Sequence, residues 1–370
     1  MKSVNHVYEK AVSLEQRKYS VHRALIGRRD KGNFKKYADN EDEVAEIAFN
    51  WIANYKTEKH KPIVIYDGIT RKKRKIVVPT FKELVVQHCV VNALMPMFMQ
   101  GMYYHSYGSI PGRGAHKAKR HIQKWIRNDP KNCKYVLKMD IHHFFDSISH
   151  DIIKEMLKKR IHDERMLDLL FKIIDTTEEG LPLGFYTSQW LANWFLEGLD
   201  HYIKEELKAV YYVRYMDDMV IFGSNKRELH RMRELIQFYL VNELNLALKD
   251  NWQVYRFDYI RNGEHHGRDL DFMGFRFYRD RIVMRKSIMY KATRKAAKIG
   301  KKEKPTIYDC RQMLSYVGWI THTNTYNMYL VWIKPKVNIG KCKKRISNYD
   351  KRIRKEQSQW LGDYQKILVA

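Results

Sequence analysis

The chain has 370 residues, of which 44% are hydrophobic and 13% aromatic, and its 69 Lys and Arg against 42 Asp and Glu give a formal charge of +27. This apolar content excludes a mainly disordered chain, and the length suffices for two or three domains with cores of their own. The cysteines are widely spaced and form no CxxC pair, which excludes a disulfide scaffold and predicts reduced, buried thiols at Cys89, Cys133, Cys310 and Cys342.

The first half of the chain alternates between helical and strand patterns. Residues 1–60 are predicted to be helical, with a capping box between Asn40 and Glu43 at one helix start. Later segments follow the periodicity of their apolar side chains. In chain order we expect strands at 62–67 and 75–78, a helix at 81–99, a glycine-rich loop at 106–116, a helix at 117–126, a strand at 135–141 and a helix at 150–160 that opens near Ser149.

The second half begins with a long amphipathic pattern that predicts one helix over 188–208. Two β-rich runs around a charged turn then predict a hairpin at 211–223. Further predicted elements are a helix at 228–244, a strand at 251–257, a hairpin-like segment at 268–283 and basic helices from about 285. Strands and helices interleave without a βαβ rhythm, which favours an α+β fold with an antiparallel sheet backed by helices and a separate helical C-terminal domain.

The excess of positive charge predicts a polyanionic partner, nucleic acid above all. Basic clusters recur along the chain and predict a long basic groove, although each cluster is also compatible with a solvated helix face. These clusters lie at 71–75, 113–120, 294–304 and 341–354. No apolar run approaches the ~20 residues of a membrane span, and the N-terminus has no apolar segment typical of secretion. We therefore expect a soluble cytoplasmic protein.

Three acidic residues stand out in this basic chain. Asp140 ends a predicted strand, and Asp217 and Asp218 occupy the turn of the predicted hairpin. Adjacent carboxylates repel each other unless a cation is close, and Mg²⁺ is bound by one or two carboxylates together with substrate phosphates. If the strand lies beside the hairpin, Asp140 and Asp217 converge on such a site. The alternative is an ordinary polar hairpin turn.

The segment Tyr215-Met216-Asp217-Asp218 resembles the YxDD box of reverse transcriptases, and Asp140 in KMDIHHFFDSI resembles their first catalytic motif. Five further segments are similar to motifs of that family in the same order, so that the resemblance covers about residues 60–285. These segments are 75–87, 107–116, 180–188, 245–250 and 272–277. The resemblance implies a right-hand polymerase that makes DNA from RNA, with a helical extension at 1–60, fingers and palm at 61–284, and a basic helical thumb at 285–370.

The resemblance also implies roles for individual residues. Two Mg²⁺ ions would be held by Asp140, Ile141, Asp217 and Asp218, of which the three aspartates would be catalytic. Phe145 would lie under the sugar and select deoxynucleotides, and the alternative is a core aromatic. Lys249 would assist the pyrophosphate leaving group, and the alternative is a solvated lysine. The other residues expected at the nucleotide are Arg74, Lys75, Leu183, Gly184 and Gln189, and those expected at nucleic acid are Arg113, Lys117, Arg120, Tyr215, Met216 and Gly274.

One loop departs from the common family pattern. Many members have Gln-Gly and Ser-Pro where this chain has Leu183-Gly184 and Ser188-Gln189, and the form found here resembles diversity-generating retroelement reverse transcriptases. Replacing an amide by an alkyl side chain removes a hydrogen-bond partner beside the templating base, so lower fidelity is expected. The resemblance implies cDNA synthesis with errors at adenines, and a small basic accessory protein as partner.

Two other functions remain open from the sequence. One is a bacterial antiviral-defence reverse transcriptase, and the other is a non-catalytic RNA-binding protein derived from a polymerase. The aromatic residues after 285 either hold an RNA–DNA duplex or pack the thumb core. His265 and His266 have no further ligand at metal spacing and are predicted to lie in a surface loop.

Overall fold

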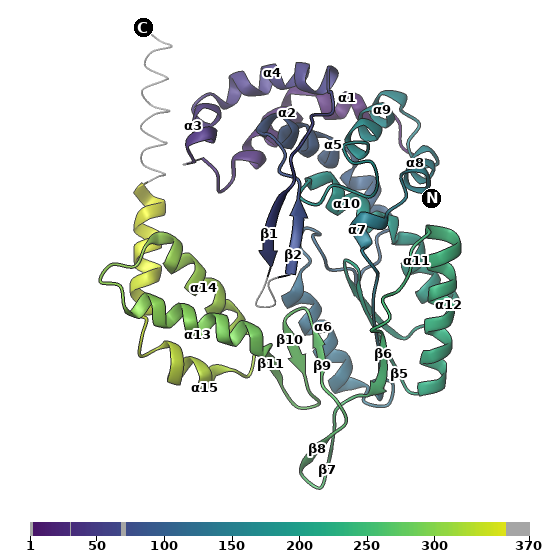
Figure 1. Ribbon diagram of the computed structural model, residues 1–370, viewed down its shortest axis with the longest axis vertical. Coiled ribbons are helices and arrows are strands. Elements are labelled where there is room, and N and C mark those ends of the chain that lie inside the picture. The colour runs from purple at the N-terminus through teal and green to yellow at the C-terminus, as the bar shows by residue number, and fades with distance from the viewer. Residues whose placement is uncertain (1–2, 30, 68–71, 353–370) are drawn as a thin grey trace. The chain divides into compact units, whose positions relative to one another are not determined.

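The computed structural model describes residues 3–29, 31–67 and 72–352 (Figure 1). The chain forms two compact units, the first ending at Arg256 and the second beginning at Phe257. Within the described part, no helix combines the length and the apolar character that crossing a membrane requires. All four cysteines are free and buried, as predicted.

The first unit begins with four helices, so the helical character predicted for residues 1–60 holds for most of the described part, whereas residues 55–60 are not helical. They are α1 (Val7–Val12), α2 (Leu14–Leu25), α3 (Gly32–Ala38) and α4 (Glu41–Ala53). The helices α1, α2 and α4 pack against the long buried helix α5 (Phe81–Gln100). A capping box is present at Thr80 and Glu83 of α5, whereas the one predicted at Asn40 is wrong. The Asn40 amide instead donates to the Lys36 carbonyl of the preceding turn.

Two antiparallel strands, β1 (Ile63–Asp67) and β2 (Lys72–Ile76), form a ribbon that extends away from α4 and α5 (Figure 1). The predicted strand at 75–78 was placed too late in the chain. Val77 leaves the ladder because its backbone N–H donates to the Leu183 carbonyl at 2.8 Å. The ribbon therefore ends where the chain joins the 180–189 loop. Arg71 of the basic run lies outside the described residues.

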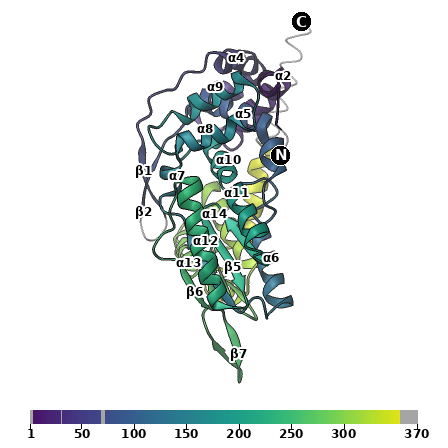
Figure 2. The same ribbon diagram turned by 90° about the vertical axis from the view of Figure 1, so that its right-hand side faces the viewer.

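The centre of the first unit is a four-stranded antiparallel sheet with the strand order β4-β5-β3-β6. Its strands are β3 (Tyr135–Asp140), β4 (Tyr211–Tyr215), β5 (Asp218–Gly223) and β6 (Gln253–Arg256). Helix α12 (Lys226–Leu244) packs on β3, β5 and β6 (Figure 2). Its buried stripe recurs at three- and four-residue spacing, which is why this segment is helical; the stripe is Leu229, Met232, Ile236, Leu240 and Leu244. The predicted α+β fold with an antiparallel sheet backed by helices is confirmed.

Shorter helices complete the first unit. They are α6 (Ala115–Asn128), α7 (Phe144–Ser147), α8 (His150–Lys158), α9 (Glu164–Ile174), α10 (Tyr186–Phe195), α11 (Glu197–His201) and the π-helix η1 (Tyr202–Glu206). Ser149 caps α8 as predicted. The single helix predicted over 188–208 is wrong, because Leu196 has φ −92° and ψ 5° and separates α10 from α11. The buried Leu196 packs in the core, so tertiary packing overrides the local helical pattern.

The second unit contains small sheets and helices. The strands β7 (Tyr259–Arg261) and β8 (Glu264–His266) form one hairpin, and β9 (Leu270–Phe272), β10 (Phe275–Phe277) and β11 (Ile282–Met284) form a three-stranded sheet. The predicted hairpin-like segment therefore has one strand more than expected. Helices follow at α13 (Lys286–Gly300), α14 (Ile307–Thr321), α15 (Tyr326–Met328), η2 (Tyr329–Ile333) and 339–352. They share a core that includes Met313, Ile333 and Cys342.

Candidate active site

Strand alternation determines where Asp140 and Asp218 lie. In β3 the side chains of Leu137 and Met139 are buried in the core of the first unit, so Asp140 lies on the opposite face of the sheet. Strand β3 pairs with β5 in a register that sets Asp140 directly opposite Asp218. The sheet thus brings together two carboxylates from positions 78 residues apart in the sequence.

Asp217 lies in the two-residue turn that joins β4 to β5, beside Asp140. Tyr215 and Asp218 are partners across this hairpin, and Met216 has a positive φ of 57°. Burial, together with the negative charge of Asp140, raises the pKa of Asp217 to about 6. The structure therefore brings the three predicted aspartates together at one edge of the sheet.

Lys249 contacts one of these carboxylates directly. Its ammonium group donates to Asp140 Oδ2, and its backbone N–H donates to the Asp140 carbonyl at 2.8 Å. A bridge between Ile141 and Leu248 continues this contact, and the Ile141 side chain is fully buried. The segment at 247–249 therefore holds Lys249 against Asp140, and the alternative of a freely solvated lysine does not describe this position.

The carboxylates fit a divalent cation. Asp140 Oδ1 is buried and accepts no hydrogen bond from the described residues. Burial and then the negative charge of Asp140 raise the pKa of Asp217, although the Lys249 ammonium group acts in the opposite direction. Hard cations such as Mg²⁺ prefer carboxylate oxygens and would satisfy both conditions. Asp140, Asp217 and Asp218 are the residues that could hold such an ion.

Phe145 lies in the short helix α7, five residues after Asp140. Its ring is half-buried and meets Phe144 edge-on at a centroid distance of 5.5 Å. The Phe145 carbonyl accepts from the Leu181 N–H at 2.7 Å. A Cβ at Gly180 would approach that carbonyl oxygen to 2.5 Å, so glycine is required for this contact. Phe144 is the fully packed core aromatic of the two.

The Leu183-Gly184 loop is held by one backbone and one side-chain hydrogen bond. Val77 donates to the Leu183 carbonyl, and Gln87 accepts from the Tyr186 N–H at 2.7 Å. Gly184 has φ 122°, and a Cβ there would lie 2.1 Å from the Val77 carbonyl oxygen. The Leu183 side chain is half-buried and Gln189 is exposed on α10. This loop therefore links the end of β2 to helix α5.

The basic residues predicted to bind nucleotide or nucleic acid have different surroundings. Arg74 and Lys75 are exposed on β2, and Arg120 is exposed on α6. Arg113 donates to the carbonyls of Tyr103, Tyr104 and Ser106, which commits its guanidinium group to the protein backbone. The Lys117 ammonium lies 5.4 Å from the centre of the Tyr104 ring.

Two predicted features belong to the second unit. Gly274 has φ 87°, and a Cβ there would lie 2.8 Å from both Ile288 and Trp319.

His265 and His266 lie on strand β8, so the predicted loop is wrong although both side chains are exposed. His265 Nδ1 lies 2.8 Å from Asp258, and Asp280 completes a possible cation cluster that the sequence did not suggest. Arg281 is also 2.7 Å from His265 Nε2, which opposes a cation there.

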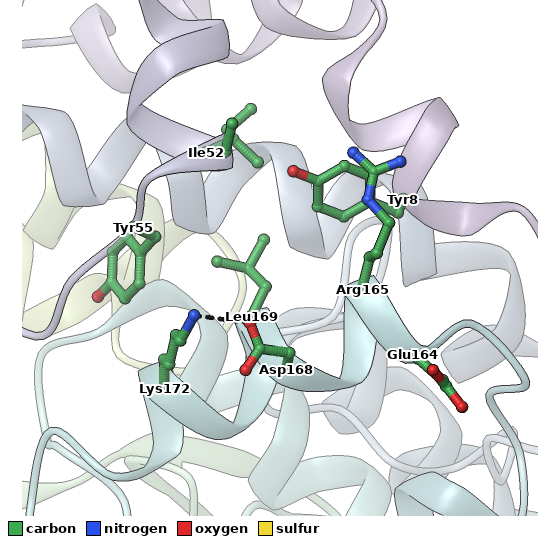
Figure 3. Close-up of a pocket in the computed structure, with 9 residues that line it drawn as sticks. Tyr8, Ile52, Tyr55, Glu164, Arg165, Asp168, Leu169 and Lys172 are labelled. Carbon is green, nitrogen blue, oxygen red and sulfur yellow. Dashed lines mark hydrogen bonds and ion pairs between the residues drawn. The ribbon is translucent and has the colours of Figure 1, made fainter.

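A separate cavity of about 380 Å³ lies among the helices of the first unit (Figure 3). Figure 3 shows Lys172 directed at Asp168, and Arg165 beside the Tyr8 ring. The Lys172–Asp168 distance is 2.6 Å and Arg165 lies 3.9 Å from the centre of the ring. Because these cations already have partners, the cavity does not compete with the aspartate cluster as a catalytic site.

Sequence reasoning missed a group of polar residues directly behind the turn at Met216 and Asp217. Arg214 and Asp200 are both fully buried, and Asn193 is nearly so. The polar–apolar alternation around Arg214 is compatible with an exposed strand residue, and its partners come from α10 and α11. The only sequence signal was a charged residue inside an otherwise apolar and aromatic strand.

Several curated proteins are similar to part of this chain. Protein YkfC of Escherichia coli is 24% identical over 253 residues, covering 57% of this chain and 64% of that protein. The retron Ec73 reverse transcriptase of Escherichia coli is 27% identical over 174 residues, covering 43% and 52%. The group II intron-encoded protein LtrA of Lactococcus lactis is 26% identical over 144 residues, covering 36% and 23%. The chain thus matches less than two thirds of the length of each of these relatives.

Among solved structures, telomerase from Candida tropicalis superposes with a TM-score of 0.47 and 12% identity, covering 73% of this chain and 57% of that one. The family described as reverse transcriptase (RNA-dependent DNA polymerase) matches residues 57–255, which is more than half of the chain and includes the three aspartates. The chain therefore belongs to the reverse transcriptase family.

Proposed function

We propose that the chain is an RNA-directed DNA polymerase that extends a primer on an RNA template by two-metal phosphoryl transfer. The observation that carries this proposal is the meeting of Asp140, Asp217 and Asp218 at one edge of the sheet. A pair of Mg²⁺ ions bound there would stabilise the attacking and leaving oxygens of the reaction. Asp140 and Asp217 are the proposed main ligands, and Asp218 is the third carboxylate. Ile141 is proposed to contribute its backbone carbonyl oxygen.

Other residues of the first unit fit the nucleotide. Lys249 is held beside Asp140 and supplies a positive charge for the leaving pyrophosphate. Arg74 and Lys75 are exposed on the ribbon and offer charge to the triphosphate. Phe145 presents a half-buried ring five residues after Asp140, where a bulky group excludes a 2′-hydroxyl. The substrates are therefore proposed to be deoxynucleoside triphosphates.

The nucleic acid is proposed to bind to both units. Residues 61–284 would act as fingers and palm, the helices after 285 as a thumb, and 1–60 as an extension. Residues 285–352 carry 18 Lys and Arg against three acidic residues, which suits contact with a phosphate backbone. The proposed contacts in the first unit are Lys117, Arg120, Tyr215 and Met216, with Arg113 shaping the loop and Gly274 contributing from the second unit.

A primer-extension assay tests this function. The purified chain is given a DNA primer on an RNA template, Mg²⁺, and either deoxy- or ribonucleoside triphosphates. Extension with deoxynucleotides alone is expected, and it should disappear when EDTA removes the metal. A chain that binds the primed template tightly but never extends it, with Mg²⁺ or Mn²⁺, would support the non-catalytic RNA-binding alternative.

A finer proposal is that this polymerase is error-prone and serves a diversity-generating retroelement. The half-buried alkyl side chain of Leu183 favours this subclass, because an alkyl group offers no hydrogen bond to a base. Leu183→Gln is expected to lower misincorporation opposite template adenines severalfold without loss of extension rate. Sequencing of the cDNA made by the variant and by the unaltered chain measures this. Unchanged adenine errors would leave the defence role as the better candidate.

A further inference from the structure

The backbone at Met216 adopts a conformation that costs energy. Its φ of 57° is left-handed, a region that is unfavourable for a non-glycine residue. The residue precedes Asp217, and the Met216 carbonyl shares a rigid peptide plane with the Asp217 N–H. The orientation of that plane therefore sets the position of the Asp217 Cα atom, from which the side chain extends.

One buried side chain fixes this carbonyl. Arg214 Nη1 donates to the Met216 carbonyl at 3.1 Å, and the Arg214 side chain is fully buried. Its other N–H groups donate to Asp200 Oδ1 at 2.8 Å, Asp200 Oδ2 at 2.5 Å, Asn193 Oδ1 at 3.2 Å and the Asn193 carbonyl at 3.2 Å. All five donors of the guanidinium group are therefore used. Such an arrangement leaves Arg214 no freedom to move away from the turn.

The remaining contacts of this cluster also hold the turn. Tyr212 donates its hydroxyl to Asp200 Oδ1 at 2.7 Å, which fixes the carboxylate that holds Arg214. Asn193 Nδ2 donates to the Gly108 carbonyl at 2.7 Å. A Cβ at Gly108 would come within 2.5 Å of Met216 Cγ and 2.7 Å of Met216 N. Met216 is thus enclosed by Gly108 on one side and held by Arg214 through its carbonyl.

We propose that Arg214 is a positioning residue for the metal-binding turn: through Asp200 and Asn193 it locks the Met216 peptide and so sets the position of the Asp217 carboxylate. This inference rests on the proposed role of Asp217 as a metal ligand. A buried ion pair is a weak source of net stability, because the cost of removing two charges from water largely offsets their attraction. Every Arg214 donor serves either the Met216 carbonyl or the two residues that hold Arg214 in place, Asp200 and Asn193. This arrangement favours a role in holding the geometry of the turn.

The test compares Arg214→Lys with Arg17→Lys. Lysine keeps the positive charge but has no planar fork, so it cannot serve Asp200, Asn193 and the Met216 carbonyl together. Arg17 is the matched control, since it is also buried and donates to the backbone carbonyls of Ala45 and Glu46, in the N-terminal helices. Primer extension is measured as a function of Mg²⁺, deoxynucleotide and primed template, alongside thermal unfolding.

Arg214→Lys is expected to raise the Mg²⁺ concentration for half-maximal activity and to lower kcat, each on the order of tenfold. The KM for primed template should stay within about twofold, since the nucleic-acid contacts are intact. Arg17→Lys should lower the melting temperature but leave the Mg²⁺ dependence unchanged. Equal Mg²⁺ dependence in Arg214→Lys and the unaltered chain would overturn the proposal.

If Arg214→Lys does not fold, a second variant tests the same positioning role. Gly108→Ala removes no charge and no hydrogen bond, but its methyl group would push Met216. It should produce the same rise in Mg²⁺ requirement, and a normal requirement would contradict the proposal. Failure of the proposed function is distinguishable, because the unaltered chain would then not extend the primer, or Asp217→Asn would extend it equally well. An inactive Asp217→Asn beside an unaffected Arg214→Lys would overturn the positioning role alone.

Discussion

Asp200 and Asp217 are both acidic residues close to strand β4, yet their surroundings are opposite. Asp200 is fully buried and receives donors from Arg214 and Tyr212. Asp217 faces Asp140 and is left with a pKa raised to about 6 by its burial and by that neighbouring charge. The first carboxylate is neutralised inside the fold, whereas the second lies in a group of three carboxylates to which Lys249 contributes an ammonium group at Asp140. The contrast supports the proposal that a cation completes the second group.

Removing one carboxylate from the group of Asp140, Asp217 and Asp218 is expected to have the largest effect on activity. Asp140→Asn is expected to lower primer extension by at least about 1000-fold, because the loss of a metal ligand removes several kcal/mol of transition-state stabilisation. Its melting temperature should not fall, since the change relieves repulsion with Asp217. Single-turnover extension and calorimetry measure the two effects. Substantial activity in Asp140→Asn would contradict the metal role.

The same substitution at Asp200 should instead lower the stability of the fold. Asp200→Asn leaves the buried Arg214 charge without its counterion and is expected to destabilise the fold by about 3 kcal/mol. Urea denaturation measures this difference. Asp168→Asn, in an exposed pair with Lys172, is the control and should change stability by less than about 1 kcal/mol. A loss at Asp200 no larger than at Asp168 would mean that the buried cluster is not a structural unit.

The raised pKa of Asp217 predicts a pH dependence of metal binding. Below about pH 6 a proton competes with the cation for this carboxylate. The apparent Mn²⁺ affinity is therefore expected to fall by about tenfold per pH unit on going below 6 and to level off above it. In the metal-free chain the folded state holds this proton more tightly than the unfolded state, so the contribution of Asp217 to stability decreases as pH rises from about 4 to 6.

Titrations of Mn²⁺ followed by electron paramagnetic resonance between pH 5 and 7.5 test this dependence. The double variant Asp140→Asn/Asp217→Asn gives the background from other sites. An affinity that does not change over this range would show that Asp217 is already ionised at pH 5 or does not bind the ion.

The smallest expected effect concerns one hydroxyl group. Tyr212→Phe removes the donor to Asp200 Oδ1 but leaves Arg214 in place. It should lower the free energy of unfolding by about 1 kcal/mol and leave the Mg²⁺ requirement of extension unchanged. A shift in the Mg²⁺ requirement would show that Asp200 alone, and not the Arg214 contact with Met216, transmits the effect.

The sequence predicted the central sheet and its acidic edge because both follow from local patterns. The alternation at 135–141 and the hairpin at 211–223 place Asp140 and Asp217 at strand ends, and the structure has these strands at β3, β4 and β5. The helix α12 was also expected, since its apolar stripe is regular. Period and turn chemistry are local properties, so one sequence suffices to reveal them.

Features that depend on distant residues were not predicted. The break at Leu196 results from packing, and the end of β2 results from the bond between Val77 and Leu183, 106 residues apart. The burial of Arg214 depends on Asp200 in another helix. The Asn40 capping box failed although its sequence pattern was present. Local patterns therefore located the carboxylates, whereas the groups that hold them in place required the fold.

The most direct test of the account is a crystal structure of the chain with Mn²⁺, primed template and a non-hydrolysable deoxynucleotide, with anomalous scattering used to locate the metal. The account predicts Mn²⁺ bound between the carboxylates of Asp140 and Asp217, with the Met216 carbonyl still bonded to Arg214. A map in which the ions contact other residues, and these two carboxylates contact none, would contradict it.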